Sequence, residues 1–155
     1  MKVLHGMSEV AGQGIYSVKG LRANGVSADM AVWRPNTFDY PIDISLNIGK
    51  KKYLYPWYAF KMFVFFLGAT FKYDCFHFHY AHSLLPFGLD LMLLKSLNKK
   101  IFFEFHGSEL RGQINNIKYP YFHNISQVKR QSKLIKKEIE YADGIILHDI
   151  ELKPH

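Results

Sequence analysis

The sequence has little cysteine: Cys75 is the one thiol in 155 residues. A single cysteine cannot form a disulfide within the chain, which excludes the disulfide-rich class of small secreted domains. Because Cys75 lies inside an apolar run, we expect a small buried side chain rather than a nucleophile. A reducing, cytoplasmic setting follows from the same absence of disulfides.

Long hydrophobic runs are also scarce. The N-terminal apolar stretch is too short and too interrupted for a signal peptide. Residues 53–71 are the one candidate for a membrane span, but Lys61 stands in their middle, and a central lysine costs about 2.5–3.5 kcal/mol on insertion. We therefore expect no span. Residues 50–58, from Lys50 to Tyr58, combine lysines with interfacial aromatics. Two interpretations stay open for this segment. It contacts the inner face of a membrane peripherally, or it is a packed aromatic helix beside a solvated run of lysines.

Acidic residues are fewer than basic ones: the sequence has 13 Asp and Glu and 20 Lys and Arg, which gives a net charge of +7. A basic surface suits a nucleic acid, an anionic lipid surface or a phosphate-bearing ligand. Because the sequence shows no recognition motif with basic and aromatic residues interleaved on strands, we expect no nucleic-acid partner. The hydrophobic fraction of 48% supports a real core, so residues 1–155 are expected to form a single domain.

Strand-like and helix-like patterns alternate along the chain. Strands are predicted over residues 2–7, 26–33, 76–80, 100–105 and 144–147, with a short one over 42–46. Helices are predicted over residues 15–23, 57–71, 86–97 and from Asn124 or Ser126 to Tyr141. This alternation predicts an α/β fold with a doubly wound parallel sheet, Rossmann-like in type.

The buried faces of two helices are predicted from their apolar spacing. In the helix over residues 57–71 the expected inner stripe is Phe60, Phe63, Val64 and Leu67. In the last helix it is Val128, Leu134, Ile135 and Ile139. The many lysines of that last helix are expected to form a solvated face.

Gly12 and Gly14 stand in a loop before the first predicted helix. Two glycines there let backbone amides approach an anion, which a helix N-terminus also favours. As a dinucleotide fingerprint the loop is incomplete, because Ser17 occupies the third glycine position. No acid ends the second strand, and Arg34, which lies there, suits at best a 2′-phosphate. An anion-binding loop, a plain turn and an NADP site all stay open.

Histidines follow two of the predicted strands. His106 comes directly after strand 100–105 and before Gly107. There its imidazole, whose pKa can be tuned around neutrality, can donate a hydrogen bond to a ligand. Ser108 and Glu109 follow, and they either contact a ligand or cap a turn. His82 lies in the loop after strand 76–80 and is also placed for ligand contact.

Three residues of metal-binding types lie on one face of strand 76–80 and of the residue before it. Cys75, His77 and His79 alternate at period two, and such a face can in principle build a zinc site. The strand is expected to be central and covered on both faces, and the sequence offers no obvious nearby carboxylate to complete a ligand set. We therefore expect hydrogen-bonded core histidines and no metal site.

Five segments together resemble a known family. They are residues 2–5, the glycine loop, residues 74–79, residues 105–111 and residues 141–146. In this order they resemble the N-terminal half of family 4 glycosyltransferases, which have the two-domain GT-B architecture. That family has a strand ending in Asp-(apolar)-(apolar)-His-x-His, a later strand ending in His-Gly-(Ser/x)-(Asp/Glu), and an Ala-Asp-x-(apolar) run. The resemblance covers nearly the whole chain.

The resemblance implies sugar transfer with retention from a nucleotide-sugar donor, without a cofactor or a required metal. The acceptor would be a saccharide or a lipid-linked saccharide of polysaccharide or lipopolysaccharide assembly. It implies that His106 is catalytic, beside the transferred sugar, and that Gly12 and Gly14 lie near the donor diphosphate and the acceptor. The implied substrate-binding residues are His82, Ser108, Glu109 and Arg111, with Glu109 standing where the family often has Asp.

One departure from the family limits what the chain can do. The family's donor site lies mainly in a second Rossmann-like domain with a Glu-x7-Glu motif, which these 155 residues do not contain. We therefore expect a truncated acceptor-side domain that is inactive alone. A non-catalytic Rossmann-like module that binds a nucleotide or a membrane surface is the alternative from another class. An NADP-linked oxidoreductase that uses Arg34 is the third.

Overall fold

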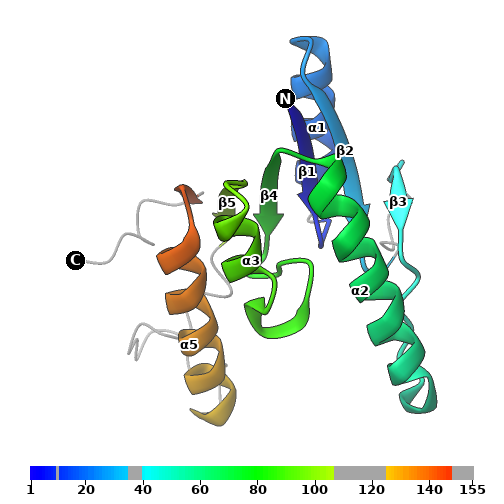
Figure 1. Ribbon diagram of the computed structural model, residues 1–155, viewed down its shortest axis with the longest axis vertical. Coiled ribbons are helices and arrows are strands. Elements are labelled where there is room, and N and C mark those ends of the chain that lie inside the picture. Colours follow the sequence, from blue (N-terminus) through cyan, green and yellow to red (C-terminus); the bar gives the residue numbers. More distant parts are fainter. Residues whose placement is uncertain (10, 35–39, 107–124, 148–155) are drawn as a thin grey trace.

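The computed structural model describes residues 1–9, 11–34, 40–106 and 125–147. The described strands form one parallel sheet in the order β3-β2-β1-β4-β5-β6. They are β1 (Lys2–Gly6), β2 (Ser27–Val32), β3 (Ile44–Ser45), β4 (Cys75–His79), β5 (Lys100–Phe105) and β6 (Gly144–Leu147). The helices are α1 (Gln13–Ala23), α2 (Tyr55–Lys72), α3 (Leu91–Ser96) and α5 (Ile125–Tyr141), with short 3₁₀ turns η1 (Lys52–Leu54) and η2 (Pro86–Gly88). The predicted α/β class and parallel, Rossmann-like sheet are confirmed (Figure 1).

Helices cover the sheet from both sides. The larger core joins one face of the strands to α2, α3 and α5 through Phe66, Leu94 and Ile135. The smaller core joins the other face to α1 through Ile15 and Val18. The strands are rich in apolar residues on both faces, as strands covered by helices on both sides require.

Side chains alternate along each strand, and this alternation decides what the two faces carry. In β4, Phe76 and Phe78 enter the larger core, whereas Cys75 enters the smaller one. His77 and His79 have the same parity as Cys75 and therefore lie on the face that α1 partly covers. The thiol is buried, and burial, with the carboxylates of Asp143 and Asp74, raises the pKa of Cys75 to about 11.

The chain reverses its direction of winding between β1 and β4. From β1 it runs outward to β2 and β3, and it then returns through α2 to place β4 on the other side of β1. In open parallel sheets, the carboxyl ends of the two strands at such a switch point border the usual ligand crevice. His5 lies near the end of β1, and His79 is the last residue of β4.

The predicted inner stripe of α2 is wrong. Phe60, Phe63, Val64 and Leu67 are all exposed, and the buried residues are Met62, Phe66, Ala69 and Thr70. The helix is apolar around most of its circumference, so spacing alone does not select its inner face. Lys61 lies between the two faces, and its ammonium donates a hydrogen bond to the Leu46 carbonyl. Among the described residues, no helix has both the length and the apolarity needed to cross a bilayer.

The helix predicted over residues 86–97 is broken into two pieces. Pro86–Gly88 forms a 3₁₀ turn in which Phe87 has a φ of +62°, and α3 begins only at Leu91. The buried carboxylate of Asp90 explains the break, because it accepts hydrogen bonds from the Ser83 hydroxyl at 2.6 Å and the Leu84 amide at 2.8 Å. These bonds hold the preceding loop against the start of α3.

Candidate functional site

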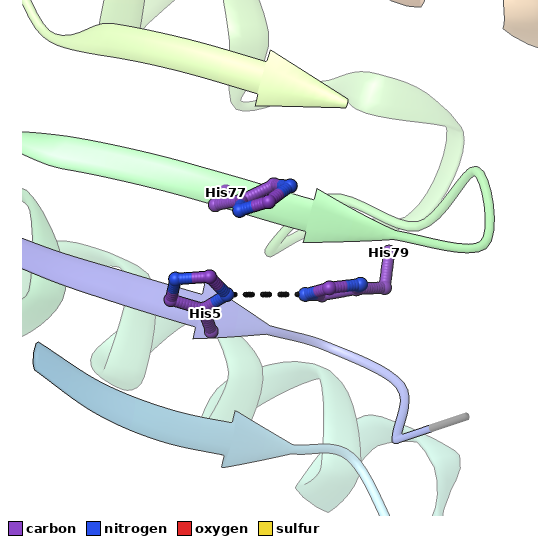
Figure 2. Close-up of side chains that lie close together, drawn as sticks. All are labelled: His5, His77 and His79. Carbon is purple, nitrogen blue, oxygen red and sulfur yellow. Dashed lines mark hydrogen bonds between the residues drawn. The ribbon is translucent and has the colours of Figure 1, made fainter. Parts of the chain in front are cut away.

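A cluster of imidazoles and one carboxylate lies at the carboxyl end of the central strands. We call the set His5, His77, His79, Glu104 and His106 the histidine cluster. The parallel register places His5 beside His77 and His79 beside Glu104. All of them have the parity of the α1 face, so their side chains converge on one side of the sheet. Figure 2 shows the three imidazoles of β1 and β4 facing one another.

The imidazoles of the cluster are within contact distance of each other. His5 Nδ1 and His79 Nε2 are 3.1 Å apart and share a hydrogen bond (Figure 2). The His77 ring centre lies 4.5 Å from that of His5 and 4.7 Å from that of His79. His5 and His79 are almost fully buried. The expected hydrogen-bonded core histidines are therefore present, but as a packed group rather than as isolated residues.

Glu104 supplies the carboxylate that the sequence did not reveal. Its Oε2 lies 3.0 Å from His77 Nε2 and 3.6 Å from His79 Nδ1, and its Oε1 lies 3.7 Å from His106 Nε2. The expectation that no carboxylate stands near these histidines is therefore wrong. A signal was available, because a glutamate inside the aromatic strand Phe102-Phe103-Glu104-Phe105 must find a partner when it is buried.

The environment keeps the innermost histidine neutral. Burial, together with the neighbouring His77 and His79, lowers the pKa of His5 to about 3, and the Glu104 carboxylate only partly opposes this shift. At neutral pH His5 is therefore an uncharged imidazole with a lone pair on one ring nitrogen. Such a nitrogen can accept a hydrogen bond or ligate a metal.

A second group of rings continues the cluster along the same edge of the sheet. Tyr80 lies between His106 and His82, with ring centres 6.2 Å and 6.1 Å away, and His79 stacks on His106 at 5.8 Å. His82 also meets Trp33 edge-on at 4.9 Å. The loop after β1 joins this group, since Ser8 Oγ is 3.4 Å from His82 Nδ1. The structure thus brings His5, His82 and His106 to one edge, which we call the rim.

The glycine loop has a structural reason for both glycines. Gly12 has a φ of +88°, and a Cβ at Gly14 would lie 2.8 Å from the Met30 side chain and 2.9 Å from the Glu9 carboxylate. That carboxylate accepts hydrogen bonds from the amides of Gly14 at 3.3 Å and Ile15 at 2.9 Å. An anion at this helix terminus must therefore displace Glu9. A role for Gly12 and Gly14 near a donor diphosphate stays a prediction, and so do the roles of Ser108, Glu109 and Arg111, which lie outside the described residues.

A groove begins at the rim and runs toward the start of α2. A cavity of about 350 Å³ is lined by His82, Trp33 and Arg34. It adjoins a hollow of about 580 Å³ that shares Arg34 with it and is lined by Tyr55 and Tyr58 at its far end. The guanidinium of Arg34 is held there by a 2.8 Å hydrogen bond to the Ile48 carbonyl. The groove therefore carries a guanidinium near the rim and tyrosine rings near α2.

The last helix adds a carboxylate to this groove that the sequence pattern did not indicate. Glu138 is fully buried and lines the cavity beside His82. The predicted stripe of α5 is correct for Ile135, which is buried, and wrong for Ile139, which is exposed. Glu138, next to Ile139 in the sequence, takes the inner position instead. A prediction from the spacing of apolar residues cannot detect a buried glutamate.

Comparison with known proteins adds no family. No protein-family model matches the chain, and no curated protein sequence matches it.

Proposed function

We propose that the chain is the acceptor-side, N-terminal domain of a retaining glycosyltransferase of GT-B architecture. The proposal rests on the convergence of His82, Tyr80 and His106 at the carboxyl edge of a Rossmann-like sheet, next to the groove. The substrate class is a saccharide acceptor, free or lipid-linked, in polysaccharide or lipopolysaccharide assembly. The donor is a nucleotide sugar held mainly by a second domain.

The chemistry of the rim suits a carbohydrate ligand. Aromatic rings offer apolar faces to the C–H surfaces of a sugar, while histidine nitrogens exchange hydrogen bonds with its hydroxyls. Tyr80 and His82 present stacked rings with centres 6.1 Å apart. In this proposal His106 contacts the transferred sugar, and Glu104, 3.7 Å from its Nε2, orients its ring.

The groove favours a lipid-linked acceptor over a free saccharide. Arg34 and His82 supply cationic and polar groups suited to a phosphate-linked sugar at one end. Tyr55, Tyr58 and Phe63 supply an apolar surface at the other end. Beyond it stand Lys50, Lys51 and Lys52 and the exposed rings of Tyr53 and Trp57. Such a segment suits the headgroup region of an anionic membrane, where a lipid-linked acceptor resides.

A binding experiment on the 155-residue chain tests the proposal. The amide spectrum of the ¹⁵N-labelled chain is titrated with a short-chain polyprenyl-diphosphate hexosamine, with the polyprenyl diphosphate alone, with the free hexosamine and with NADPH. We expect the lipid-linked sugar to shift the amides of Tyr80 to Ser83 and to bind more tightly than either of its parts.

Two variants with equal loss of charge sharpen this test. Arg34→Ala removes the cation of the groove, and Lys19→Ala removes an exposed cation on α1. We expect only Arg34→Ala to weaken the lipid-linked sugar, by about tenfold, since a lost charge-assisted hydrogen bond costs about 1.5–3 kcal/mol. Saturable binding of NADPH without binding of the sugar would favour the oxidoreductase. Binding of lipid without any contribution from the sugar would favour the membrane-binding module.

A further inference from the structure

Two nitrogens of the histidine cluster already have the spacing of metal ligands. In a tetrahedral zinc site with Zn–N bonds of about 2.0–2.1 Å, two ligating nitrogens lie roughly 3.3–3.4 Å apart. His5 Nδ1 and His79 Nε2 are 3.1 Å apart. One ligand atom from each of His5, His77 and His79 lies within 4.8 Å of the others. The three imidazoles are therefore close enough to share one ion.

We propose that His5, His77 and His79 form a binding site for a divalent metal ion of the zinc type. Three imidazoles are a ligand set that zinc accepts, and three protein ligands leave one position for water or for an oxygen of a ligand. The site lies at the switch point of the sheet, between β1 and β4. It is independent of the proposed transferase activity, which requires no metal.

The carboxylate of Glu104 stands where a metal site needs an outer partner. Metal-bound histidines commonly donate their second ring N–H to a carboxylate, which fixes the tautomer and the ring orientation. Glu104 Oε2 is 3.0 Å from His77 Nε2 and 3.6 Å from His79 Nδ1, so it can accept from both. In this arrangement His5 binds the ion through Nδ1, His79 through Nε2 and His77 through Nδ1. The remaining nitrogens of His77 and His79 are the two that face Glu104.

Charge and burial support the same assignment. A divalent ion in a pocket where His5 and His79 are at most 2% exposed needs a nearby negative charge. Glu104 is 5% exposed and supplies that charge. His79, Glu104 and His106 also place one ligand atom each within 4.8 Å of the others. We assign Glu104 Oε2 to the positioning of His77 and His79, its nearer neighbours, while Glu104 Oε1 faces His106 on the rim.

The direct test is metal binding by the intact chain. The purified protein is stripped with a chelator and titrated with Zn²⁺ and, separately, with Co²⁺. We expect a single equivalent of either ion to bind and the Co²⁺ form to show the intense visible absorption of a tetrahedral, nitrogen-rich site. In ¹⁵N spectra of the histidine rings, Zn²⁺ is expected to shift His5, His77 and His79 and to leave His82 in place.

Three variants test one proposed ligand, its outer partner and a control. His77→Gln is expected to lower Zn²⁺ affinity by at least about 100-fold, and Glu104→Gln by about 10–100-fold, as for other outer-shell partners. His82→Gln removes a histidine of the rim from outside the set and is the matched control, with unchanged affinity. Circular dichroism checks that each variant folds.

The proposal fails if the wild-type chain binds neither ion at a stoichiometric site, which would leave the cluster as a hydrogen-bonded core. It also fails if His82→Gln loses as much affinity as His77→Gln. If a variant does not fold, the ring spectra of the wild-type chain decide alone.

Discussion

The carboxylate of Glu9 accepts a hydrogen bond of 2.9 Å from the backbone amide of Ile15. With a second bond from Gly14, it occupies the N-terminus of α1, the position that the glycine loop would otherwise offer to a phosphate. Within the described residues, the loop is thus held by an acid of the chain itself. An external anion and Glu9 compete for the same amides.

Removal of Glu9 tests whether the loop binds anions. We expect Glu9→Ala to lower the free energy of unfolding by about 1 kcal/mol, as for the loss of a helix cap, and to raise the affinity for inorganic pyrophosphate. Urea unfolding and calorimetric titration measure the two effects. Glu140→Ala, an exposed site with the same change in charge, is the control. Equal pyrophosphate affinity in both variants would contradict an anion site at Gly12 and Gly14.

Asp29 predicts an acid-sensitive contribution to stability. Burial raises its pKa, but hydrogen bonds from Tyr73 at 2.6 Å and Lys72 at 3.0 Å outweigh burial and leave the pKa of Asp29 below its usual value. The stabilisation is then complete above the unfolded-state pKa of about 3.9 and is lost as the pH falls through the lower, folded-state value.

The Asp29→Asn variant measures this contribution. At neutral pH we expect the free energy of unfolding to fall by about 1.5–3 kcal/mol, the range for a hydrogen bond to a charged group. The difference from wild type should shrink as the pH is lowered from about 4 through the folded-state pKa, below which Asp29 is neutral in the folded and the unfolded chain. Urea unfolding across this range gives the values. A difference that stays constant down to pH of about 2 would show that the charge of Asp29 does not matter.

The start of α2 predicts binding to anionic vesicles. Trp57 and Phe60 stack with ring centres 5.6 Å apart, and each is 56% exposed. Burial of one such ring is worth about 1.5–3 kcal/mol, so we expect Trp57→Ser to weaken binding to phosphatidylglycerol vesicles by at least about tenfold. Co-sedimentation with these vesicles and with phosphatidylcholine vesicles measures it, and added salt should weaken the former.

A matched variant lies on the same helix. Phe71 is 87% exposed but stands 14 residues beyond Trp57, about 21 Å along the helix and away from the three lysines. Phe71→Ser is expected to have little effect if the membrane meets the start of α2. An equal loss of vesicle binding in both variants would instead indicate that the whole exposed apolar face of α2 binds nonspecifically, as expected for a protein-protein surface.

The order of the elements was predictable, because each strand is a short apolar run set off by glycine, proline or polar residues. The bounds of β1, β2, β4 and β5 follow within two residues. The inner face of α2 was not predictable, since its apolar side chains surround the axis and only packing selects Met62 and Phe66. The break before α3 depends on Asp90, which accepts hydrogen bonds from Ser83 and Leu84. These bonds form only in the folded structure and cannot be read from the sequence.

The candidate site was predictable in its position but not in its composition. Strand ends in a parallel sheet share one edge, so His82 and His106, which follow two predicted strands, are expected at the same edge. The pairing of His79 with Glu104 depends on the register between β4 and β5, which sequence patterns leave open. The same register brings the Glu104 carboxylate, which the sequence pattern did not single out, next to His79. The glycosyltransferase assignment stays a prediction.

The rim joins positions far apart along the chain, since His5 lies on β1 and His82 follows β4. An unfolded chain therefore has no rim, and any molecule that binds there shifts the folding equilibrium toward the native state by RT ln(1 + [L]/Kd). Thermal denaturation can therefore be used to search for ligands before any reaction is known, because compounds and ions that bind the folded chain raise the midpoint temperature of unfolding.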